Sequence, residues 1–300
     1  MSQPTSPHTP QSAASLLDYI KALPQYLMPG HLISRLTHRF TRIEQPAIKN
    51  PFTRWFAATF KIDMAEAANG DLTSYRHFNA FFTRELRPGL RPVCPQKNAL
   101  ACPVDGRVSQ AGAIREGRVF QAKGHDYSLQ TLLGGEADLA AEFSQGHFTT
   151  IYLSPRDYHR IHMPCSGRLR EMIHVPGRLF SVNPATTRVI PGLFARNERV
   201  VSIFDTEFGP MAMVKVGAVN VGSIETVWAG EVTPPAGSSV QRWQYSAEQA
   251  ITLAKGEEMG RFNMGSTVVL VMANPQWQWQ AEFQPELAVK LGQCIALLED

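Results

Sequence analysis

One serine in this sequence has neighbours that would let the main chain break itself. Ser266 follows Gly265 and leads into the apolar run Thr267–Met272, which is expected to form a strand. A serine hydroxyl can attack the preceding carbonyl carbon and turn the peptide bond into an ester, and glycine there removes a Cβ that would obstruct the attack. β-Elimination then leaves dehydroalanine, whose hydrolysis gives a pyruvoyl group at a new N-terminus. Taken alone, Gly-Ser-Thr at a strand entrance is also an ordinary turn.

The attack needs a base, and reactive polar side chains are densest in the segment 154–164, directly after the apolar run Phe148–Leu153. Strand ends are where a rigid scaffold places reactive groups. His159 and His162 are an odd number of residues apart, so they converge only if the segment turns. Asp157 is close enough in sequence to support His162. No cysteine or acidic pair beside the histidines completes a metal-ligand set, so no metal is expected.

A third segment, Pro103-Val104-Asp105-Gly106, supplies another carboxylate. Asp-Gly between two extended runs is typical of a tight turn. A histidine held by a carboxylate is the usual base for a serine nucleophile, so the functional alternative is that Asp105 orients His162.

Short strands are expected to position these groups. From Val93 onward, apolar and β-branched runs alternate with Gly, Pro and Asn, which indicates an antiparallel or mixed β structure. The fold class is therefore α+β, with a β-rich catalytic body over residues 93–300 preceded by helices. Strands are expected near residues 107–111, 148–153, 199–204, 211–221, 223–229 and 267–272.

Residues 13–92 are expected to form helices with one apolar side. Apolar residues recur at helical spacing before and after Pro29-Gly30. Two further helices are expected over Asn50–Phe60 and Asp71–Arg84, the second with Asp71 as its N-cap. Residues 1–62 carry seven basic and two acidic side chains, so these helices could lie on an anionic membrane. The alternative is that they dock on the body with their arginines in water.

Composition limits the remaining possibilities. With 44% hydrophobic and 18% charged residues the chain is not disordered in bulk, although residues 1–12 are expected to be a disordered tail. No apolar run approaches the roughly 18 to 20 residues of a membrane span. The first residues do not resemble a secretory signal, and four scattered cysteines suit reduced thiols in a cytosol.

Several segments together resemble the bacterial, pyruvoyl-dependent phosphatidylserine decarboxylase family over roughly residues 50–275. One departure is Met264, where the family usually has leucine, and the two side chains are similar in size. The resemblance is carried by residues 81–88, 103–106, 123–129, 154–167, 194–199, 204–210, 221–227 and 255–267.

The resemblance implies a self-processing enzyme that is cleaved between Gly265 and Ser266 into a large chain, 1–265, and a small chain, 266–300. It implies that Asp105, His162 and Ser266 form the charge relay for this cleavage. It also implies that His159 acts in decarboxylation, through headgroup contact or proton transfer. Ser266 would become the covalent pyruvoyl group, and no metal or diffusible cofactor would be needed.

The same resemblance implies the reaction and its setting. The pyruvoyl carbonyl would form a Schiff base with the amine of phosphatidylserine, accept the electrons left by CO2, and release phosphatidylethanolamine for phospholipid biosynthesis. The protein would be a peripheral protein on the cytoplasmic face of the cell membrane. The large and small chains would remain together as a heterodimer, and the sequence leaves open whether two heterodimers associate.

Three other functions are compatible with parts of the sequence. A serine hydrolase could use Asp105, His162 and Ser266 as an ordinary triad, but Ser266 lacks a Gly-x-Ser-x-Gly elbow. A non-catalytic membrane-binding module would leave three reactive clusters unused. A nucleic-acid binder is disfavoured because the positive charge lies on helices with apolar stripes and without a known nucleic-acid-binding signature, so no nucleic-acid partner is expected.

Overall fold

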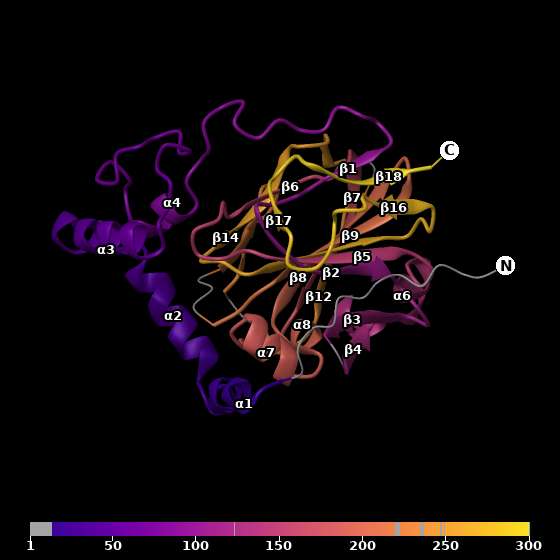
Figure 1. The fold of residues 1–300 in the computed structure, drawn as a ribbon, viewed down its shortest axis with the longest axis horizontal. Helices are drawn as coiled ribbons and strands as arrows, with labels where there is room; N and C mark the ends of the chain where they lie inside the picture. Colours follow the sequence, from indigo (N-terminus) through magenta and orange to yellow (C-terminus); the bar gives the residue numbers. More distant parts are fainter. Residues whose placement is uncertain are drawn as a thin grey trace.

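The computed structural model describes residues 14–122, 124–219, 223–234, 237–246, 248 and 250–299. The expected disordered tail, residues 1–12, lies outside the described residues. The chain forms an N-terminal series of helices along one side of a body made of β-sheets (Figure 1). This arrangement confirms the predicted α+β class.

The N-terminal helices contribute little to the main core. Their apolar residues either remain exposed or pack in a small aromatic cluster, which we define as Phe56, Phe78, Phe81 and Phe82 with Ala57 and Ile62. The elements are α1 (Leu16–Ala22), a 3-10 turn η1 (Leu23–Tyr26), α2 (Gly30–Phe40), α3 (Pro46–Thr59) and α4 (Phe78–Phe82).

The helix predicted over Asp71–Arg84 is wrong for most of its length. Only Phe78–Phe82 is helical, and His77 rather than Asp71 caps it, through its Nδ1 and the amide of Ala80. The Asp71 carboxylate instead accepts a hydrogen bond from the Thr73 amide at 2.8 Å. A short polar side chain that bonds the backbone two residues on favours a turn over a helix.

The body is built around one nine-stranded antiparallel sheet. Its central strand, β15, is buried at every position and pairs with β9 on one side and β5 on the other. Burial on both faces explains why this segment is a continuous run of apolar residues instead of an alternating pattern. The order is β12-β7-β8-β9-β15-β5-β2-β17, with β13 pairing β7, and the strands are β2 (Gly106–Ala113), β5 (His147–Tyr152), β7 (Gly167–Val175), β8 (Arg199–Thr206), β9 (Gly209–Val216), β12 (Gln241–Gln244), β13 (Thr252–Leu253), β15 (Thr267–Met272) and β17 (Ala288–Val289).

Three smaller sheets complete the body. The four-stranded sheet β11-β10-β14-β6 brings the histidine segment beside the strand that leads into Ser266. This sheet contains β6 (Arg160–His162), β10 (Ser223–Thr226), β11 (Gly230–Thr233) and β14 (Glu258–Asn263). A three-stranded sheet contains β1 (Ala99–Ala101), β16 (Trp277–Trp279) and β18 (Cys294–Leu298). A two-stranded sheet contains β3 (Arg118–Ala122) and β4 (His125–Ser128).

Four short helices lie among the strands. Arg199 on β8 is buried and donates hydrogen bonds to the carbonyls of Leu132 and Thr131, which fixes α5 against the central sheet. The helices are α5 (Leu129–Leu132), α6 (Ala137–Glu142), α7 (Pro184–Val189) and α8 (Leu193–Arg196).

The central sheet contains a fully buried lysine. Lys215 on β9 donates a hydrogen bond from Nζ to Ser202 Oγ at 2.7 Å, and its Nζ lies 5.6 Å from the centre of the Trp228 ring. No carboxylate pairs with it in the described part of the chain. Burial therefore lowers the pKa of Lys215 to about 7, because removing an ammonium group from water disfavours its charged form.

This lysine makes the stability of the fold depend on pH. Between pH 7 and the ordinary pKa of 10.5, the unfolded chain holds a proton on Lys215 that the folded chain does not. The free energy of unfolding should therefore rise with pH in this window, with a slope of up to about 1.4 kcal/mol per pH unit. Urea unfolding at pH 7.5 and 9 measures the rise.

Lys215→Met should remove most of that rise, whereas Lys97→Met, at an exposed position, should preserve it. An equal slope in wild type and Lys215→Met would show that Lys215 titrates normally in the folded protein.

Candidate functional site

The chain crosses between two sheets at the residues where cleavage is expected. β14 ends at Asn263 and β15 begins at Thr267. Between them, Met264 has a φ of 95°, a left-handed conformation that costs a residue with a side chain about 1–3 kcal/mol. The Met264 side chain packs against the aromatic cluster, and this contact helps to hold the strained turn. Backbone strain therefore lies next to the peptide bond between Gly265 and Ser266.

Ser266 is held at the start of the central strand. Its carbonyl accepts a hydrogen bond from the Leu153 amide at 2.8 Å, which extends the pairing between β15 and β5 by one step. The residue is only 2% exposed, and its hydroxyl has no hydrogen-bond partner. A buried hydroxyl without a partner loses the solvation it had in water, so this position is unusual for a structural serine.

His159 is the imidazole that lies against the junction. A methyl group placed on Gly265 would come within 2.5 Å of His159 Cε1, so the ring packs directly on the glycine. The ring also stacks on Phe82, with ring centres 4.1 Å apart. The ring is completely buried, and neither nitrogen has a hydrogen-bond partner among the described residues. Burial lowers the pKa of His159 to about 3, and Arg84 adds to this effect, so the ring is neutral.

His162, three residues after His159, has other hydrogen-bond partners. Its Nδ1 donates to the Gly256 carbonyl at 2.9 Å, so Nε2 carries the lone pair and accepts from the Tyr158 hydroxyl at 3.1 Å. Burial lowers the pKa of His162. No hydrogen bond joins His162 to the hydroxyl of Ser266, since that hydroxyl has no partner in this arrangement.

Asp105 does not orient His162 in this arrangement. Its carboxylate accepts two hydrogen bonds from Arg91, at 3.1 Å to Nε and 2.7 Å to Nη2, together with bonds from Lys290 Nζ and the Leu291 amide. Burial would raise the pKa of Asp105, but the bonds from Arg91 and Leu291 outweigh it and lower the pKa. The nearest link to His162 is through the main chain, where the His162 amide donates to the carbonyl of Pro103, two residues before Asp105.

Asp157 forms its hydrogen bonds with Ser154 in this arrangement, and its support of His162 stays a prediction. Its Oδ2 accepts hydrogen bonds from both the amide and the hydroxyl of Ser154, each at 2.7 Å. These bonds close the turn between β5 and β6 that carries His159 to the junction. Asp157 therefore shapes the loop, and the partners of His162 are Gly256 and Tyr158.

The last of the N-terminal helices, α4, also contributes to the site, which the sequence did not indicate. Phe82 stacks on His159, and Asn79 Nδ2 donates to Asn263 Oδ1 at 2.9 Å, one residue before Met264. Residues 81–88 formed part of the resemblance but received no role there. Sequence periodicity had no signal for these contacts, because they join residues far apart in the chain, 184 positions apart for Asn79 and Asn263.

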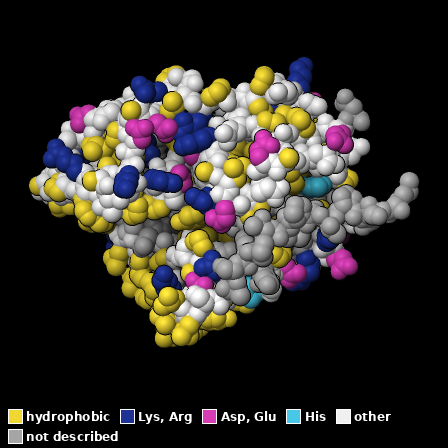
Figure 2. Space-filling view, in the orientation of Figure 1, with side chains coloured by type: hydrophobic (Ala, Val, Ile, Leu, Met, Phe, Trp, Pro, Cys, Tyr) yellow, Lys and Arg dark blue, Asp and Glu magenta, His cyan; other side chains and the backbone are white. Residues whose placement is uncertain are grey.

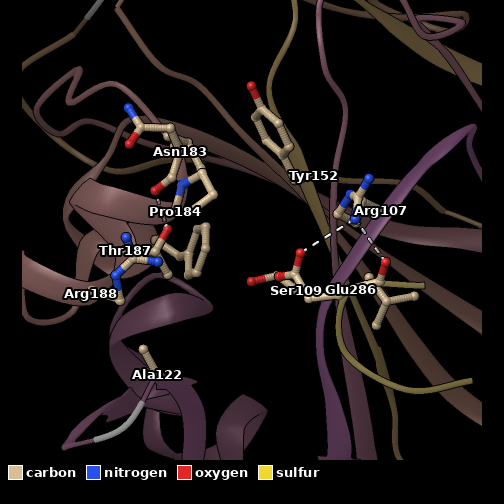
Figure 3. A pocket seen from close by; sticks show the side chains of 12 residues that line it. Arg107, Ser109, Ala122, Tyr152, Asn183, Pro184, Thr187, Arg188 and Glu286 are labelled. Carbon is tan, nitrogen blue, oxygen red and sulfur yellow. Dashed lines mark hydrogen bonds and ion pairs between the residues drawn. The ribbon is translucent and has the colours of Figure 1, made fainter. Parts of the chain in front are cut away.

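A cavity of about 260 Å³ lies between β2, β5 and α7, and neither Gly265, Ser266 nor His159 is among the residues that line it. Tyr152, whose neighbour Leu153 bonds Ser266, and Arg107 form one wall, and Asn183 and Arg188 face them from α7 and its N-cap (Figure 3). The lining combines apolar side chains with hydroxyl, amide and guanidinium groups, which suits a ligand with a charged end. No group of three metal-binding side chains occurs in the described ranges.

The close contact between Gly265 and His159 yields a prediction. Gly265→Ala should displace the imidazole, lower the free energy of unfolding by about 1–3 kcal/mol and slow any cleavage at this bond. Gly112→Ala is a matched control, since its new methyl group would meet only Phe148 Cε1 at 3.9 Å. Mass spectrometry over time measures the cleavage. If Gly265→Ala were cleaved at the wild-type rate, this result would argue against close packing of His159 on Gly265.

Comparison with known proteins places this geometry in a family. The family model for phosphatidylserine decarboxylase matches residues 78–297, and a second model, PSD, matches residues 20–61. The phosphatidylserine decarboxylase proenzymes of Shewanella pealeana and Shewanella halifaxensis are each 54% identical over 287 residues, covering 95% of this chain and all of theirs. That of Shewanella amazonensis is equally similar. The chain therefore belongs to the phosphatidylserine decarboxylase family.

Proposed function

We propose that the chain is a proenzyme that cleaves itself before Ser266 and then converts phosphatidylserine to phosphatidylethanolamine and CO2. The observation that carries this proposal is the junction itself, where a buried, unpartnered serine hydroxyl follows a glycine and a strained residue. The family and its relatives support the reaction and the substrate.

The residues present fit a pyruvoyl group at position 266. The side-chain oxygen is buried and unpartnered, Gly265 leaves no Cβ in the way, and His159 closes the site against water. Such a group supplies a carbonyl that condenses with the substrate amine and takes up the electrons released with CO2. His159 is neutral and packed on Gly265, so it is placed to contact the headgroup or to deliver a proton to the substrate carbon.

For self-cleavage we propose Ser266 as nucleophile, His162 as base and Asp105 as the group that orients the base. In the present arrangement the His162 nitrogens bond Gly256 and Tyr158, so this step requires the imidazole to exchange those partners. Its unprotonated Nε2 is the atom that would take the proton of Ser266. The negative charge of Asp105 acts on His162 from nearby and favours its protonated form.

Separate variants distinguish the two histidines. Ser266→Ala and His162→Ala should remain a single full-length chain, whereas His159→Ala should be cleaved but decarboxylate phosphatidylserine at least about 100-fold more slowly. Intact-mass spectrometry reports the cleavage and the modification of residue 266, and release of CO2 reports the activity. Cleaved Ser266→Ala would overturn the nucleophile. If His162→Ala were cleaved and His159→Ala remained uncleaved, the roles proposed for the two histidines would have to be exchanged.

An active wild-type protein with an unbroken main chain would overturn the proposal as a whole. Labelling of Ser266 by a fluorophosphonate in that intact chain would instead support an ordinary serine hydrolase.

We further propose that the two products remain together as a heterodimer. The small chain would contain β15, β16, β17 and β18. β15 pairs over six residues with each of β5 and β9, and β17 and β18 pair with β2 and β1. Asp105 in the large chain also binds Lys290 and Leu291 in the small chain.

A membrane-facing role for the N-terminal helices is part of the same proposal. No described helix is long and apolar enough to cross a bilayer. Hydrophobic side chains gather along the lower left edge of the molecule, over α1 to α3 (Figure 2). The exposed ones include Leu27 at 90% and Trp55 at 57%, and exposed Arg35 and Arg39 lie on α2 between them. Such a surface suits peripheral binding to the anionic, cytoplasmic face of the cell membrane.

The cavity supports this orientation. α1 reaches it through Asp18, which forms a bidentate ion pair with Arg188 on the cavity wall. A lipid that leaves the bilayer beside α1 would therefore meet the polar lining that contains Arg188 and Tyr152.

Replacing Leu27, Leu36 and Trp55 by serine should weaken binding to vesicles that contain phosphatidylserine by about tenfold or more. Cosedimentation measures the binding. Phe120→Ser with Val240→Ser, at exposed apolar positions outside these helices, is the matched control. Unchanged vesicle binding by the triple variant would exclude α1–α3 as the membrane surface.

A further inference from the structure

A buried arginine beside the junction has no acidic partner. Arg84 follows α4 and is only 3% exposed, yet its Nε and Nη1 have no hydrogen-bond partner. Nη2 donates to the carbonyl of Arg156 at 3.1 Å, and the guanidinium carbon lies 5.7 Å from the centre of the Phe81 ring. Nε–H and Nη1–H lie on different edges of the guanidinium, so each can donate a charge-assisted hydrogen bond to one oxygen of an anion.

The acidic groups around Arg84 are committed to other donors. Glu66 and Asp105 both pair with Arg91, and Asp157 accepts from Ser154. Tyr75 donates its hydroxyl proton to the carbonyl of Asn69. Arg84 is therefore a buried cation without an ion pair among the described residues, and leaving such a charge uncompensated is costly. Burial lowers its pKa, which is consistent with that cost.

The position of Arg84 relates it to Gly265 through His159. Arg156, whose carbonyl Arg84 binds, is three residues before His159, and Phe82, two residues before Arg84, stacks on the His159 ring. The Cε1 atom of that ring packs on Gly265. The positive charge of Arg84 also reaches His159, whose pKa it helps to lower. Arg84 and Gly265 thus border the same buried imidazole.

The proposed cleavage creates a new anion at this place. The ester joins the Gly265 carbonyl carbon to Ser266 Oγ. A base removes the Cα proton of Ser266, the electron pair forms the Cα=Cβ bond, and the Cβ–Oγ bond breaks with both electrons leaving on oxygen. The leaving group is the carboxylate of Gly265, which becomes the C-terminus of the large chain.

We infer that Arg84 binds the Gly265 carboxylate as it forms, through its positive charge and a free N–H group, and thereby promotes the elimination step of self-cleavage. This inference rests on the proposed function and extends it to the leaving group. The anion gives Arg84 its missing partner, and the arginine gives a buried carboxylate the charge that it needs. The same ion pair holds the new C-terminus beside His159 in the mature enzyme.

The inference predicts the step at which self-cleavage of an Arg84 variant is slowed. Arg84→Gln should form the ester but eliminate about 100-fold more slowly, because the positive charge that stabilises the developing carboxylate is lost. The full-length chain would then accumulate with an ester at Gly265, which hydroxylamine at neutral pH splits into a large chain ending in a hydroxamate and a small chain beginning with serine. Arg84→Lys, which retains the charge but not the planar guanidinium and its fixed donors, should fall between Arg84→Gln and wild type.

Two controls isolate this effect. Arg87→Gln, at an exposed position on the same segment, should be cleaved like the wild type. Ser266→Ala, which has no hydroxyl at the junction, should resist hydroxylamine there. Thermal unfolding checks that each variant is folded. If Arg84→Gln does not fold, the elimination rate of Arg84→Lys tests the inference in its place.

Arg84 variants that are cleaved at the wild-type rate, or that stay intact without a hydroxylamine-sensitive bond, would overturn the inference. Neither result would affect the proposed function, which fails only if the wild-type chain is active without being cleaved.

Discussion

The structure depends on the pairing that fixes one end of its central strand. β15 is bonded to β5 and β9 along its whole length, and the bond from Leu153 to the Ser266 carbonyl carries that order one residue further. On the N-terminal side of this strand, only three residues connect the four-stranded sheet to the central sheet. This short connection places Met264 in a left-handed conformation. The rigid strand on one side and the strained turn on the other meet at a single peptide bond.

Burial determines which groups around that bond are charged and which are neutral. His159 is neutral because its surroundings cannot solvate a proton, and the hydroxyl of Ser266 is removed from water as well. Asp105 retains its charge only because three donors bind it. In a site with so little water, each new charge requires a specific partner, and this makes the distribution of arginines around the junction chemically significant.

The sequence predicted the parts of this site that depend on local pattern. Apolar runs located β5, β8, β9 and β15, and the order of residues placed Ser266 at a strand entrance and the histidines after a strand. Strands with alternating charges, such as β7, were missed because Arg168, Arg170 and Glu171 interrupt the apolar signal.

The partners of each polar group could not be predicted in this way. Asp105 is held by Arg91 and by Lys290, 185 positions away, and α4 reaches the junction across a similar separation. Such contacts are set by the packing of whole elements, and local spacing contains no information about them. The expected helix from Asp71 failed for a related reason, since a side-chain bond to Thr73 competes with helical bonding.

The position of the proposed break within the fold has a consequence for how the protein can be made. The segment after residue 265 supplies the middle strand of the largest sheet, and without it β5 and β9 would each lose a neighbour and expose buried edges. The large chain is thus not an independent folding unit, and the covalent chain must find its native shape before it is cut. Once severed, the two pieces no longer share a backbone that could guide reassembly, so the mature molecule owes its lifetime to slow unfolding and not to reversible refolding.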